Sequence, residues 1–510
     1  MVSEETPTRP RRPLSTPLGD LVAWLETHDA DVSTRGDLDS VVVTGISLSS
    51  QRIRPGDLYA ALPGTRVHGI EFAAAAAEAG AVAILTDQDG AASDPVTDLP
   101  LVVVGSPRAL LGRLSARVYG DPATSLRMIG VTGTQGKTTT TRLLESGLQQ
   151  AGVPAAVIGT VGTRVGGADV KTSLTTPEAP DLHGLFAMMR ERHVAACAME
   201  VSSHALVMGR VDGVVFDVAV FTNFGRDHLD FHTDVEDYFR AKASLFTPQR
   251  ARLGLVNVDD EHGRRLVEEA TIPVRTFSLT GREAHWQAVD VYLSATGSRF
   301  TVLGPDGIAV DAAVGLPGDF NVANGLAAIA AASEAGFDTR RVAEGIATGG
   351  GVPGRLERID EGQDYVVVVD YAHKPDAVEA AIGALRPLTE GQVIVVIGAG
   401  GDRDPGKRPI MGEIAARLAD VLVVTDDNPR TEDPAAIRAA VLAGTTAGPA
   451  DVVEIGDRRS AVREAVRRAR PGDIVLVAGK GHETGQEVQG VVHPFDDREV
   501  VREAIREATR

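Results

Sequence analysis

Cysteine, long apolar runs and a signal core are scarce or lacking in this 510-residue chain, and each scarcity excludes a class of protein. The single cysteine, Cys197, excludes an internal disulfide and fits a reducing compartment, so we expect a cytoplasmic protein. No apolar stretch reaches about 18 residues, which excludes a membrane-spanning helix. The opening segment MVSEETPTRPRRPLST has no apolar core, and it predicts a flexible tail over residues 1–13.

Basic residues are fewer than acidic ones, 51 against 70, which gives a formal net charge of −19. This charge repels nucleic acid and anionic lipid, so we expect neither as a partner. We expect small-molecule substrates and a monomeric chain, and a polyanionic substrate would need local basic residues or metal. Lysine is rare even within the basic set and occurs at Lys137, Lys171, Lys242, Lys374, Lys407 and Lys480.

The length predicts about three domains, since a domain usually has roughly 100–200 residues. Two segments indicate domain boundaries: the Gly-Asp-Pro turn sequence within 119–125 and the segment GGGVPGRLE at 349–357. We therefore predict domains over residues 14–125, 126–350 and 351–510. Hydrophobic content of 43% and charged content of 24% are typical of a soluble globular protein.

Alternating strand and helix patterns predict an α/β fold throughout. In the small N-terminal domain, 41–48 predicts a strand, and 72–87 predicts a helix, a glycine stop and a strand. Apolar strands alternating with helices predict a doubly wound, mostly parallel central sheet, with a β-rich insert at about 273–318. The C-terminal domain repeats the alternation, which predicts a Rossmann-like sheet whose strand-end loops form a binding edge.

The segment GVTGTQGKTTT (130–140) resembles a phosphate loop but lacks a glycine at Val131, where the pattern G-x-x-x-x-G-K-[ST] requires one. It follows a predicted strand and opens a predicted helix, as a phosphate loop must. Its glycines would let backbone N–H groups approach phosphates, Lys137 could neutralise the β- and γ-phosphates, and Thr138 could bind Mg²⁺. The alternative is a Gly-rich turn with a surface lysine.

Glu200 and His228 follow or end apolar strand patterns and predict metal ligands beside this loop. An isolated charge at the end of a buried strand is costly, although either residue alone could be structural. Lys242 lies in the helical pattern YFRAKASLF, where a surface lysine is the simpler interpretation. The alternative is a function that needs an amine able to lose its proton, which arginine cannot supply.

Three strand-end loops of the third domain carry Arg403, Arg430 and Glu483. Two guanidiniums and one carboxylate suit a zwitterionic ligand that has carboxylates and an amine. Solvated loop charge is the alternative interpretation.

These motifs together resemble the Mur ligases, the ATP-dependent amide ligases that build the stem peptide of peptidoglycan. The family's phosphate loop has the form T-G-T-x-G-K-[ST]-[ST], which residues 132–139 match. Further matches, in chain order, are PGDLYAALPG, LTTPEA, MEVSSHAL, TNFGRDHLDFH, AKASLF, GDFNVANGLAA, PGRLE, VDYAHKPDA, GDRDPGKRP, DNPR and GKGHE. DNPR resembles the subgroup that adds meso-diaminopimelate to UDP-N-acetylmuramoyl-L-alanyl-D-glutamate.

The resemblance implies an ADP-forming ligase with ATP as co-substrate and two Mg²⁺ ions. The D-Glu side-chain carboxylate would attack the γ-phosphate of ATP, and the amino group of diaminopimelate would attack the resulting acyl phosphate. Lysine lacks the second carboxylate of diaminopimelate, so an unpaired Arg430 would disfavour it.

The resemblance also assigns roles position by position. Catalytic residues are Lys137, Glu200, His228 and Lys242, and metal ligands are Thr138, Glu200, His228 and Lys242, the last as a carbamate (N6-carboxylysine). ATP contacts are Thr132, Gly133, Thr134, Gln135, Gly136, Lys137, Thr138, Asn321, Arg355 and Asp370. The UDP-sugar peptide would meet Leu48, Ser50, Thr65, Arg66, Val67, Thr175, Thr176, Ser203 and Arg210. Diaminopimelate would meet Arg403, Asp427, Asn428, Arg430, Gly479 and Glu483.

Departures from the family pattern and two rival functions bear on these assignments. Ser49-Ser50-Gln51 replaces a common D-S-R, Gln135 replaces asparagine, and Met208 replaces a frequent glutamine. A folylpolyglutamate synthase-like ligase would share the central fold but lack the uridine-binding region and DNPR. An NTP-dependent switch would need neither Lys242 nor the loops of Arg403 and Glu483.

Overall fold

The structure, a computed structural model, describes residues 8–93, 97–172 and 174–508. The chain forms two compact units, the first from Met1–Gln287 with Ala327–Gly345 and the second from Ala288–Leu326 with Ile346–Arg510. Residues 1–7 of the predicted flexible tail lie outside the described residues. The predicted domain boundaries after residues 125 and 350 stay predictions.

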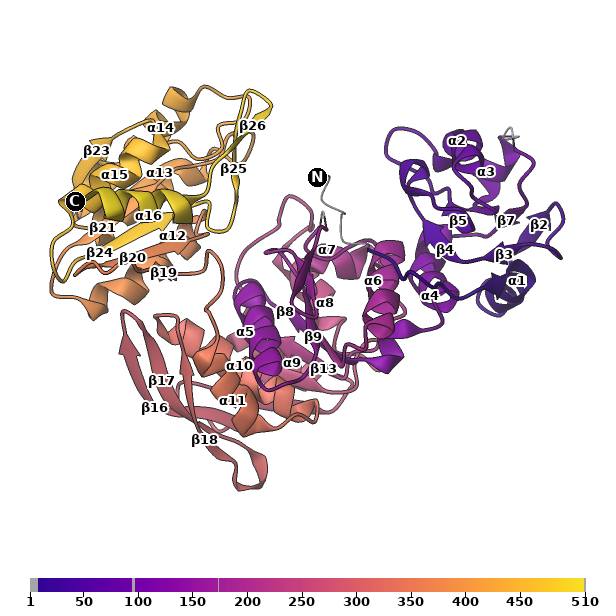
Figure 1. Ribbon diagram of the computed structural model, residues 1–510, viewed down its shortest axis with the longest axis horizontal. Coiled ribbons are helices and arrows are strands. Elements are labelled where there is room, and N and C mark those ends of the chain that lie inside the picture. The colour runs from indigo at the N-terminus through magenta and orange to yellow at the C-terminus, as the bar shows by residue number, and fades with distance from the viewer. Residues whose placement is uncertain (1–7, 94–96, 173, 509–510) are drawn as a thin grey trace. The chain divides into compact units, whose positions relative to one another are not determined.

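A small sheet forms the N-terminal part of the first unit, with the strand order β2-β7-β6-β5-β4 (Figure 1). Its strands pair in parallel except β2 with β7. They are β2 (Ser33–Arg35), β4 (Gly45–Ser47), β5 (Asp57–Ala60), β6 (Ala83–Thr86) and β7 (Leu101–Val103), and β1 (Thr16–Pro17) pairs separately with β3 (Val42–Val43). The helices are α1 (Leu18–Glu26), η1 (Ser50–Arg52), η2 (Gly69–Phe72), α2 (Ala73–Glu78), α3 (Gln88–Ala92), α4 (Pro107–Val118) and η3 (Pro122–Ser125).

The central sheet has the order β11-β10-β9-β12-β8-β13-β14-β15-β16-β17-β18, and neighbours from β9 to β16 pair in parallel. β8 (Arg127–Thr132) lies between β12 (Ala196–Glu200) and β13 (Val218–Phe221). These three strands are almost wholly buried, as apolar strands covered on both faces should be. The division between the two units falls within β16 (Trp286–Ser294).

The other elements of this region follow the predicted alternation. The strands are β9 (Ala155–Ile158), β10 (Thr163–Val165), β11 (Ala168–Val170), β14 (Gly254–Asn257), β15 (Val274–Ser278), β17 (Gly297–Leu303) and β18 (Ala309–Val314). The helices are α5 (Lys137–Gln150), α6 (Ala179–Glu191), α7 (Ser203–Val207), α8 (Val235–Ala243), α9 (Glu261–Glu269), η4 (Pro305–Gly307), α10 (Asp319–Glu334) and α11 (Thr339–Thr348).

The C-terminal sheet of the second unit has the order β19-β20-β24-β21-β22-β23 and is parallel except at β19. Separate apolar clusters, containing Val395 and Val396 respectively, cover its two faces. The strands are β19 (Glu357–Ile359), β20 (Val366–Asp370), β21 (Val393–Ile397), β22 (Val421–Val424), β23 (Asp451–Glu454) and β24 (Ile474–Ala478). The helices are α12 (Pro375–Leu385), η5 (Arg386–Leu388), α13 (Lys407–Leu418), α14 (Pro434–Leu442), η6 (Thr445–Ala447), α15 (Arg458–Arg468) and α16 (Asp497–Ala508).

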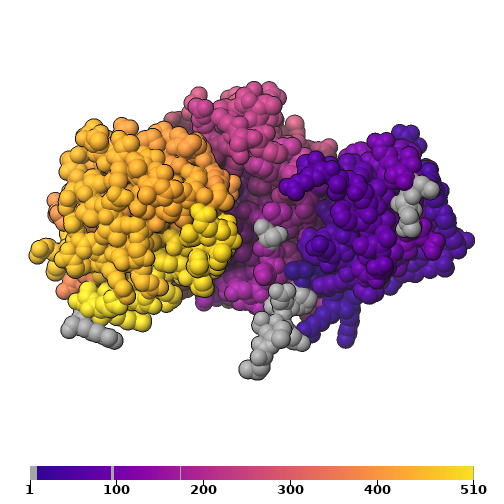
Figure 2. Space-filling view, turned by 90° about the horizontal axis from the view of Figure 1, so that it is seen from above, coloured from indigo at the N-terminus to yellow at the C-terminus, as the bar shows by residue number. Residues whose placement is uncertain are grey.

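A hairpin of β25 (Gly485–Val488) and β26 (Val491–Pro494) projects from this sheet and carries the exposed Val491 and Val492. The last part of the chain, drawn in yellow, lies at the surface of the second unit (Figure 2). Among the described residues, no helix combines the length and apolar character needed to cross a bilayer.

The predicted α/β class with a mostly parallel central sheet is confirmed, and one predicted strand is wrong in detail. The segment 41–48 forms two short strands, β3 and β4, instead of one. Between them the Thr44 N–H donates to the carbonyl O of Gly56 at 2.8 Å, and β3 pairs with β1 while β4 pairs with β5. The segment 41–48 is therefore divided because its two halves pair with two different strands.

Residues 8–13, predicted as part of the flexible tail, are instead held in place by contacts within the first unit. Arg9 is 6% exposed, and its guanidinium donates to Asp57 Oδ2 at 2.6 Å and to the Ile46 carbonyl at 3.0 Å. Asp57 belongs to β5 of the small sheet. A buried ion pair therefore anchors the segment to that sheet.

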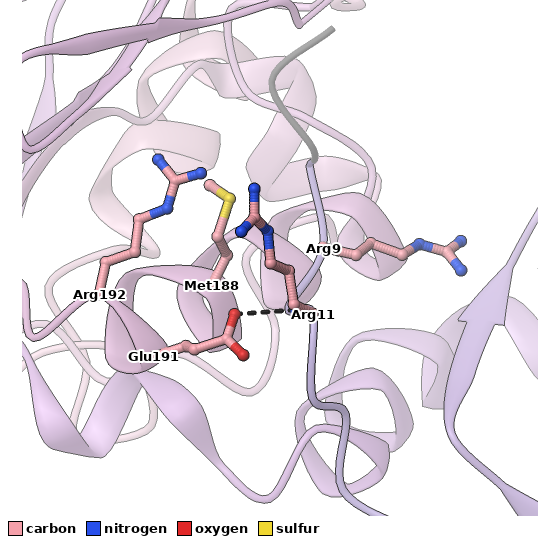
Figure 3. A pocket seen from close by; sticks show the side chains of 5 residues that line it. All are labelled: Arg9, Arg11, Met188, Glu191 and Arg192. Atoms are coloured by element: carbon pink, nitrogen blue, oxygen red, sulfur yellow. Dashed lines mark hydrogen bonds between the residues drawn. The ribbon is translucent and has the colours of Figure 1, made fainter. Parts of the chain in front are cut away.

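Arg11 and Arg12 attach the same segment to α6. Backbone N–H groups of Arg11 and Arg12 donate to the two carboxylate oxygens of Glu191 at 2.8 and 2.9 Å. Figure 3 shows Arg9 pointing away from this contact. A cavity of about 380 Å³ beside this segment is lined by Arg9, Arg11, Met188, Glu191 and Arg192.

We expect Arg9→Gln to lower the free energy of unfolding of the first unit by about 3 kcal/mol, because the Asp57 carboxylate would stay buried without its cationic partner. Urea unfolding followed by tryptophan fluorescence measures this, since the two tryptophans, Trp24 and Trp286, both lie in the first unit. Arg12→Gln is the matched control, because its side chain is exposed, and should change stability by less than about 0.5 kcal/mol. Equal losses in both variants would contradict the anchoring role of Arg9.

Candidate active site

The phosphate loop joins β8 to α5 and is fastened to the end of β13. Gly133 (φ 147°) and Gly136 (φ 83°) adopt conformations that favour glycine. A Cβ on Gly133 would lie 2.0 Å from Thr222 Oγ1. Thr222 Oγ1 donates to the Gln135 carbonyl at 2.6 Å, and the Gln135 N–H donates to Asn223 Oδ1 at 2.9 Å. The close approach of the loop to β13 therefore requires glycine at position 133.

Two lysine amines converge on one carbonyl of this loop. Lys137 Nζ donates to the carbonyls of Gly133 and Thr134 at 2.8 and 2.9 Å. Lys242 Nζ, from α8, donates to the same Gly133 carbonyl at 2.7 Å. The structure thus brings together two residues predicted to be catalytic, from segments about 100 residues apart in sequence.

Lys242 is 1% exposed, and its Nζ lies 4.4 Å from the centroid of the Tyr238 ring. Burial, and after it the charge of Lys137, holds the pKa of Lys242 well below its ordinary value, while Asp227 acts in the opposite direction. A neutral amine has a free lone pair and can react with an electrophile, which a guanidinium cannot do. The interpretation of Lys242 as a surface lysine is therefore wrong.

Glu200 ends β12 as a buried carboxylate that accepts three hydrogen bonds. Oε1 accepts from Thr138 Oγ1 at 2.9 Å and from the Thr160 N–H at 2.7 Å, and Oε2 accepts from Thr160 Oγ1 at 3.2 Å. A Cβ on Gly159 would lie 2.3 Å from Oε1, so glycine leaves the space for this carboxylate. These donors offset the cost of burying the charge.

His228 lies beyond the end of β13, on the opposite side of β8 from Glu200. Its backbone has φ 53°, and its Nε2 lies 3.4 Å from Asp227 Oδ2. Its ring packs edge-on against those of His204 and Tyr238, with centroids 4.8 and 5.8 Å apart. His228, the predicted metal ligand, is thus held in a small aromatic cluster beyond the same end of the sheet as Glu200.

The oxygen donors of Glu200 and Thr138 are of the kind that Mg²⁺ prefers. Within residues 8–93, 97–172 and 174–508, no group of three or more His, Cys, Asp or Glu side chains is placed to hold a metal ion. Glu200 and Thr138 are therefore residues of this edge whose oxygens could hold Mg²⁺.

Two predicted sugar-peptide residues of the central region, Thr175 and Thr176, are connected to Glu200 by hydrogen bonds. Thr175 Oγ1 lies 3.2 Å from Thr160 Oγ1, and Thr160 contacts the Glu200 carboxylate. Thr176 Oγ1 donates to the Glu200 carbonyl at 2.9 Å. Ser203 Oγ lies 2.9 Å from His232 Nε2. Thr160 and His232 escaped the sequence analysis, although His232 stands in the motif TNFGRDHLDFH.

Arg210 is bound to a carboxylate that the sequence analysis also missed. Arg210 Nε donates to Glu178 Oε1 at 2.8 Å, and Arg108 of α4 donates to Oε2 of the same residue at 2.8 Å. Glu178 therefore links the predicted substrate arginine to a helix of the N-terminal region. No local sequence pattern indicates this pairing, because the two arginines are 102 positions apart (210 − 108).

The predicted uridine-side residues lie at the loops of the small sheet. Leu48 follows β4 and packs against the apolar cluster of this region, and Ser50 opens η1. Residues 65–67 form an exposed turn after β5, where Val67 is one of the exposed apolar side chains. Their roles stay predictions.

Three predicted nucleotide contacts, Asn321, Arg355 and Asp370, belong to the second unit. Asn321 lies on α10 and its Nδ2 donates to the Pro317 carbonyl at 2.8 Å. The Arg355 guanidinium lies 4.5 Å over the Tyr371 ring. Asp370 ends β20, and burial raises its pKa even though its carboxylate accepts two backbone N–H groups.

The loops after β22 and β24 bring together most of the predicted amino-acid site. Asn428 Nδ2 donates to Glu483 Oε2 at 2.9 Å. Asp427 Oδ2 is buried and, within the described part of the chain, has no hydrogen-bond partner. It lies 2.5 Å from the position that a Cβ on Gly479 would take. This edge therefore offers an unsatisfied acidic oxygen beside a residue that must be glycine.

Arg430 is held in the left-handed region (φ 51°) beside the same loops. Its NH1 donates to the Gly401 carbonyl at 2.6 Å, and its Nε lies 3.3 Å from Glu487 Oε2. A Cβ on Gly400 would lie 3.0 Å from Arg430 NH1 and 4.0 Å from Arg403 Cγ, so both arginines border this glycine. The assumption that Arg430 would be unpaired without ligand is wrong, because Glu487 accompanies it.

We compare the free energy of unfolding of the wild-type protein with that of Lys242→Met. We expect the difference between them to rise with pH by about 1.4 kcal/mol per pH unit. The rise should occur between the lowered pKa of Lys242 in the folded protein and its ordinary value in the unfolded chain. In that window the unfolded chain binds a proton at Lys242 and the folded chain does not, so raising the pH favours the folded state. Urea unfolding at pH 7, 8 and 9 in bicarbonate-free buffer measures the difference. A flat or falling difference would show that folded Lys242 is protonated.

Comparison with known protein families matches three regions of the chain. Residues 42–119 match the catalytic domain of the Mur ligase family, residues 131–332 the Mur ligase middle domain, and residues 354–481 the Mur ligase glutamate ligase domain. These regions correspond in order to the small sheet, the central sheet and the C-terminal sheet.

The chain is also similar to curated proteins over nearly its whole length. It is 55% identical to the UDP-N-acetylmuramoyl-L-alanyl-D-glutamate–2,6-diaminopimelate ligase of Streptomyces avermitilis, with 98% of each chain covered. It is 51% identical to the protein of the same name from Corynebacterium glutamicum, with 91% of this chain and 92% of the relative covered. A UDP-N-acetylmuramyl-tripeptide synthetase of Leifsonia xyli is 46% identical, with 98% of each covered.

Solved structures agree with this assignment. A structure of a UDP-N-acetylmuramoyl-L-alanyl-D-glutamate–2,6-diaminopimelate ligase is 32% identical with a TM-score of 0.70, covering 98% of this chain and 100% of its own. Folylpolyglutamate synthase of Mycobacterium tuberculosis shares the fold at 19% identity and a TM-score of 0.58, covering 72% of this chain and 91% of its own. The expected family is confirmed, and the chain belongs to the Mur ligase family.

Proposed function

We propose that this protein is the ATP-dependent ligase that joins meso-2,6-diaminopimelate to the D-Glu of UDP-N-acetylmuramoyl-L-alanyl-D-glutamate. The observation that carries the proposal is similarity over 98% of the chain to a relative with that named activity, at 55% identity. The DNPR loop and the charged residues of the amino-acid edge support it. We also propose a cytoplasmic monomer with three domains divided near residues 125 and 350.

The phosphate loop and its neighbours would hold ATP and Mg²⁺. The N–H groups of Thr134 and Gln135 are already bonded to Asn223, so phosphate would bind at the start of α5 instead, where the helix dipole favours an anion. Lys137 would exchange its loop carbonyls for phosphate oxygens, and Glu200 and Thr138 would bind Mg²⁺. The ion, when bound, would neutralise charge that develops on the phosphates during transfer.

Lys242 would act as a carbamate. Its depressed pKa supplies a neutral amine, which attacks carbon dioxide; a nitrogen–carbon bond forms, the amine loses a proton, and an anionic carbamate results. Such an anion beside the loop would support a second Mg²⁺ ion, together with His228. Arginine at position 242 could not undergo this reaction, which accounts for lysine in a lysine-poor chain.

Substrate positioning accounts for the rest of the reaction. Thr175, Thr176, Ser203 and Arg210 would place the D-Glu carboxylate at the γ-phosphate, and transfer would give an acyl phosphate and ADP. The attacking amine of diaminopimelate would then form the amide and release phosphate. Because little covalent chemistry falls to the protein, rate enhancement would come from positioning and charge neutralisation.

The amino-acid edge would recognise diaminopimelate by charge. Arg403 and Arg430 suit carboxylates, whereas Asp427 and Glu483 suit ammonium groups. Glu487 already accompanies Arg430, so lysine would leave this guanidinium only partly unsatisfied. Selectivity would therefore rest on the added bidentate pairing with the second carboxylate of diaminopimelate more than on a penalty against lysine.

We expect kcat/KM for meso-diaminopimelate to exceed that for L-lysine and L-ornithine by about 100-fold, because only diaminopimelate offers a carboxylate to Arg430. ADP release with ATP and UDP-N-acetylmuramoyl-L-alanyl-D-glutamate measures turnover of each amino acid. Arg430→Ala should remove most of the advantage and leave lysine turnover within about threefold. Equal turnover of lysine by the wild type would overturn the assigned selectivity.

We expect Lys242→Ala to lose activity by at least about 100-fold and to recover part of it with added short carboxylates, which would replace the carbamate anion. Lys242→Arg should be as inactive as Lys242→Ala, because it keeps the positive charge but cannot form a carbamate. Lys171→Ala, an exposed lysine of the same unit, serves as the control. An active Lys242→Arg enzyme would rule out the carbamate.

A further inference from the structure

Lys480 is a fully buried lysine to which neither the proposed reaction nor the family resemblance assigns a role. It is 0% exposed and lies in the loop that follows β24, between Gly479 (φ 121°) and Gly481 (φ 54°). A Cβ on Gly481 would lie 2.8 Å from the Gly354 carbonyl, so the loop packs tightly there. Burying a charged group is costly unless it is paired, so a buried lysine needs hydrogen-bond partners.

The partners of Lys480 are two residues of the proposed amino-acid edge. Its Nζ donates to Asn428 Oδ1 at 2.9 Å and lies 3.2 Å from Glu483 Oε2. The Glu487 N–H donates to the same Asn428 Oδ1 at 3.0 Å. Asn428 Nδ2 in turn donates to Glu483 Oε2 at 2.9 Å. The three side chains thus form a closed set of hydrogen bonds.

This network determines which way the Asn428 amide faces. An asparagine amide presents an acceptor on one side and two donors on the other, and the two orientations are nearly isosteric. A lysine ammonium has donors only, so the amide oxygen must face Lys480. The Glu487 N–H requires the same orientation. The amide nitrogen is therefore directed toward Glu483 and keeps one N–H for a ligand.

The same network orients Glu483. Within the described residues, both hydrogen bonds to its carboxylate, from Asn428 and Lys480, involve Oε2. Oε1 therefore remains available to accept from a ligand, and the Glu483 side chain is about one-third exposed. The edge then presents an N–H donor beside a carboxylate acceptor, which matches the carboxylate and ammonium of one amino-acid end.

We propose that Lys480 is a positioning residue that determines specificity for the amino-acid substrate. It holds Asn428 so that one amide N–H faces the ligand, and it holds Glu483 so that Oε1 faces the ligand. The proposal rests on the proposed function, because it concerns the amino-acid edge of the same reaction. Lys480 acts through its neighbours and does not itself contact the amino acid.

Steady-state kinetics of Lys480→Met and Lys480→Gln test this role. Lys480→Met removes the charge and one of the two donors to Asn428 Oδ1, so the Glu487 N–H alone holds the amide and holds it less firmly. KM for meso-diaminopimelate should rise about 10- to 100-fold, while KM for ATP and for the UDP-linked substrate stays within about twofold. Lys480→Gln keeps a donor for Asn428 Oδ1 and should show a smaller rise. In both variants kcat should change less than KM. Lys171→Met, which removes an exposed lysine, should leave every KM within about twofold.

A double-mutant cycle separates positioning from a general structural effect. In an Asn428→Ala background no amide remains to be oriented, so adding Lys480→Met should raise KM for meso-diaminopimelate by less than about threefold. The same factor in both backgrounds, an unchanged KM in Lys480→Met, or a parallel rise in KM for ATP would overturn the proposal. Should Lys480→Met not fold, the same cycle with Lys480→Gln decides by the same criteria.

Turnover by the wild-type enzyme distinguishes failure of the proposed function from failure of the role of Lys480. If it turns over no amino acid in the panel, the proposed function fails and this inference fails with it. If it turns over meso-diaminopimelate while the Lys480 variants keep the wild-type KM, only the role of Lys480 is overturned.

Discussion

The contact of the phosphate loop with the end of β13 is the constraint on which the central site depends. Gly133 has no side chain, so Thr222 and Asn223 can hydrogen-bond the loop directly and hold it over the sheet edge. That placement exposes the Gly133 carbonyl to both Lys137 and Lys242. It also sets the start of α5, from which Thr138 reaches Glu200. One glycine thus shapes a loop that meets two lysine amines and leads into the helix from which Thr138 bonds Glu200.

Two buried lysines show how surroundings decide the chemistry of one residue type. Burial, and after it the charge of Lys137, lowers the pKa of Lys242, so its amine is suited to react. Lys480 is instead paired with Glu483 and Asn428, and it organises neighbours without reacting. The two sites differ in their contacts, because Lys480 Nζ lies 3.2 Å from a Glu483 carboxylate oxygen whereas Lys242 Nζ donates to a backbone carbonyl.

Much of the central region could be predicted from sequence, because its signals are local. Gly133 to Thr138, the strand before them and the helix after them form one continuous segment, and Glu200 and His228 stand near the ends of apolar runs. Thr160, Glu178 and Lys480 were missed because their importance comes from partners that no short pattern connects to them. The tail prediction was wrong over residues 8–13 for the same reason, since Asp57 and Glu191 hold that segment from distant positions.

The sequence by itself determined the α/β class, the order of strands and helices, the unusual glycine register of the phosphate loop and the family resemblance, because these depend on residue periodicity and on contiguous motifs. Only the tertiary structure decided that Lys242 is buried, that Glu487 accompanies Arg430 and that Lys480 orients Asn428. Each of these depends on desolvation or on a hydrogen bond between segments far apart in the chain, and such energies exist only once the strands have brought their loops to a common edge.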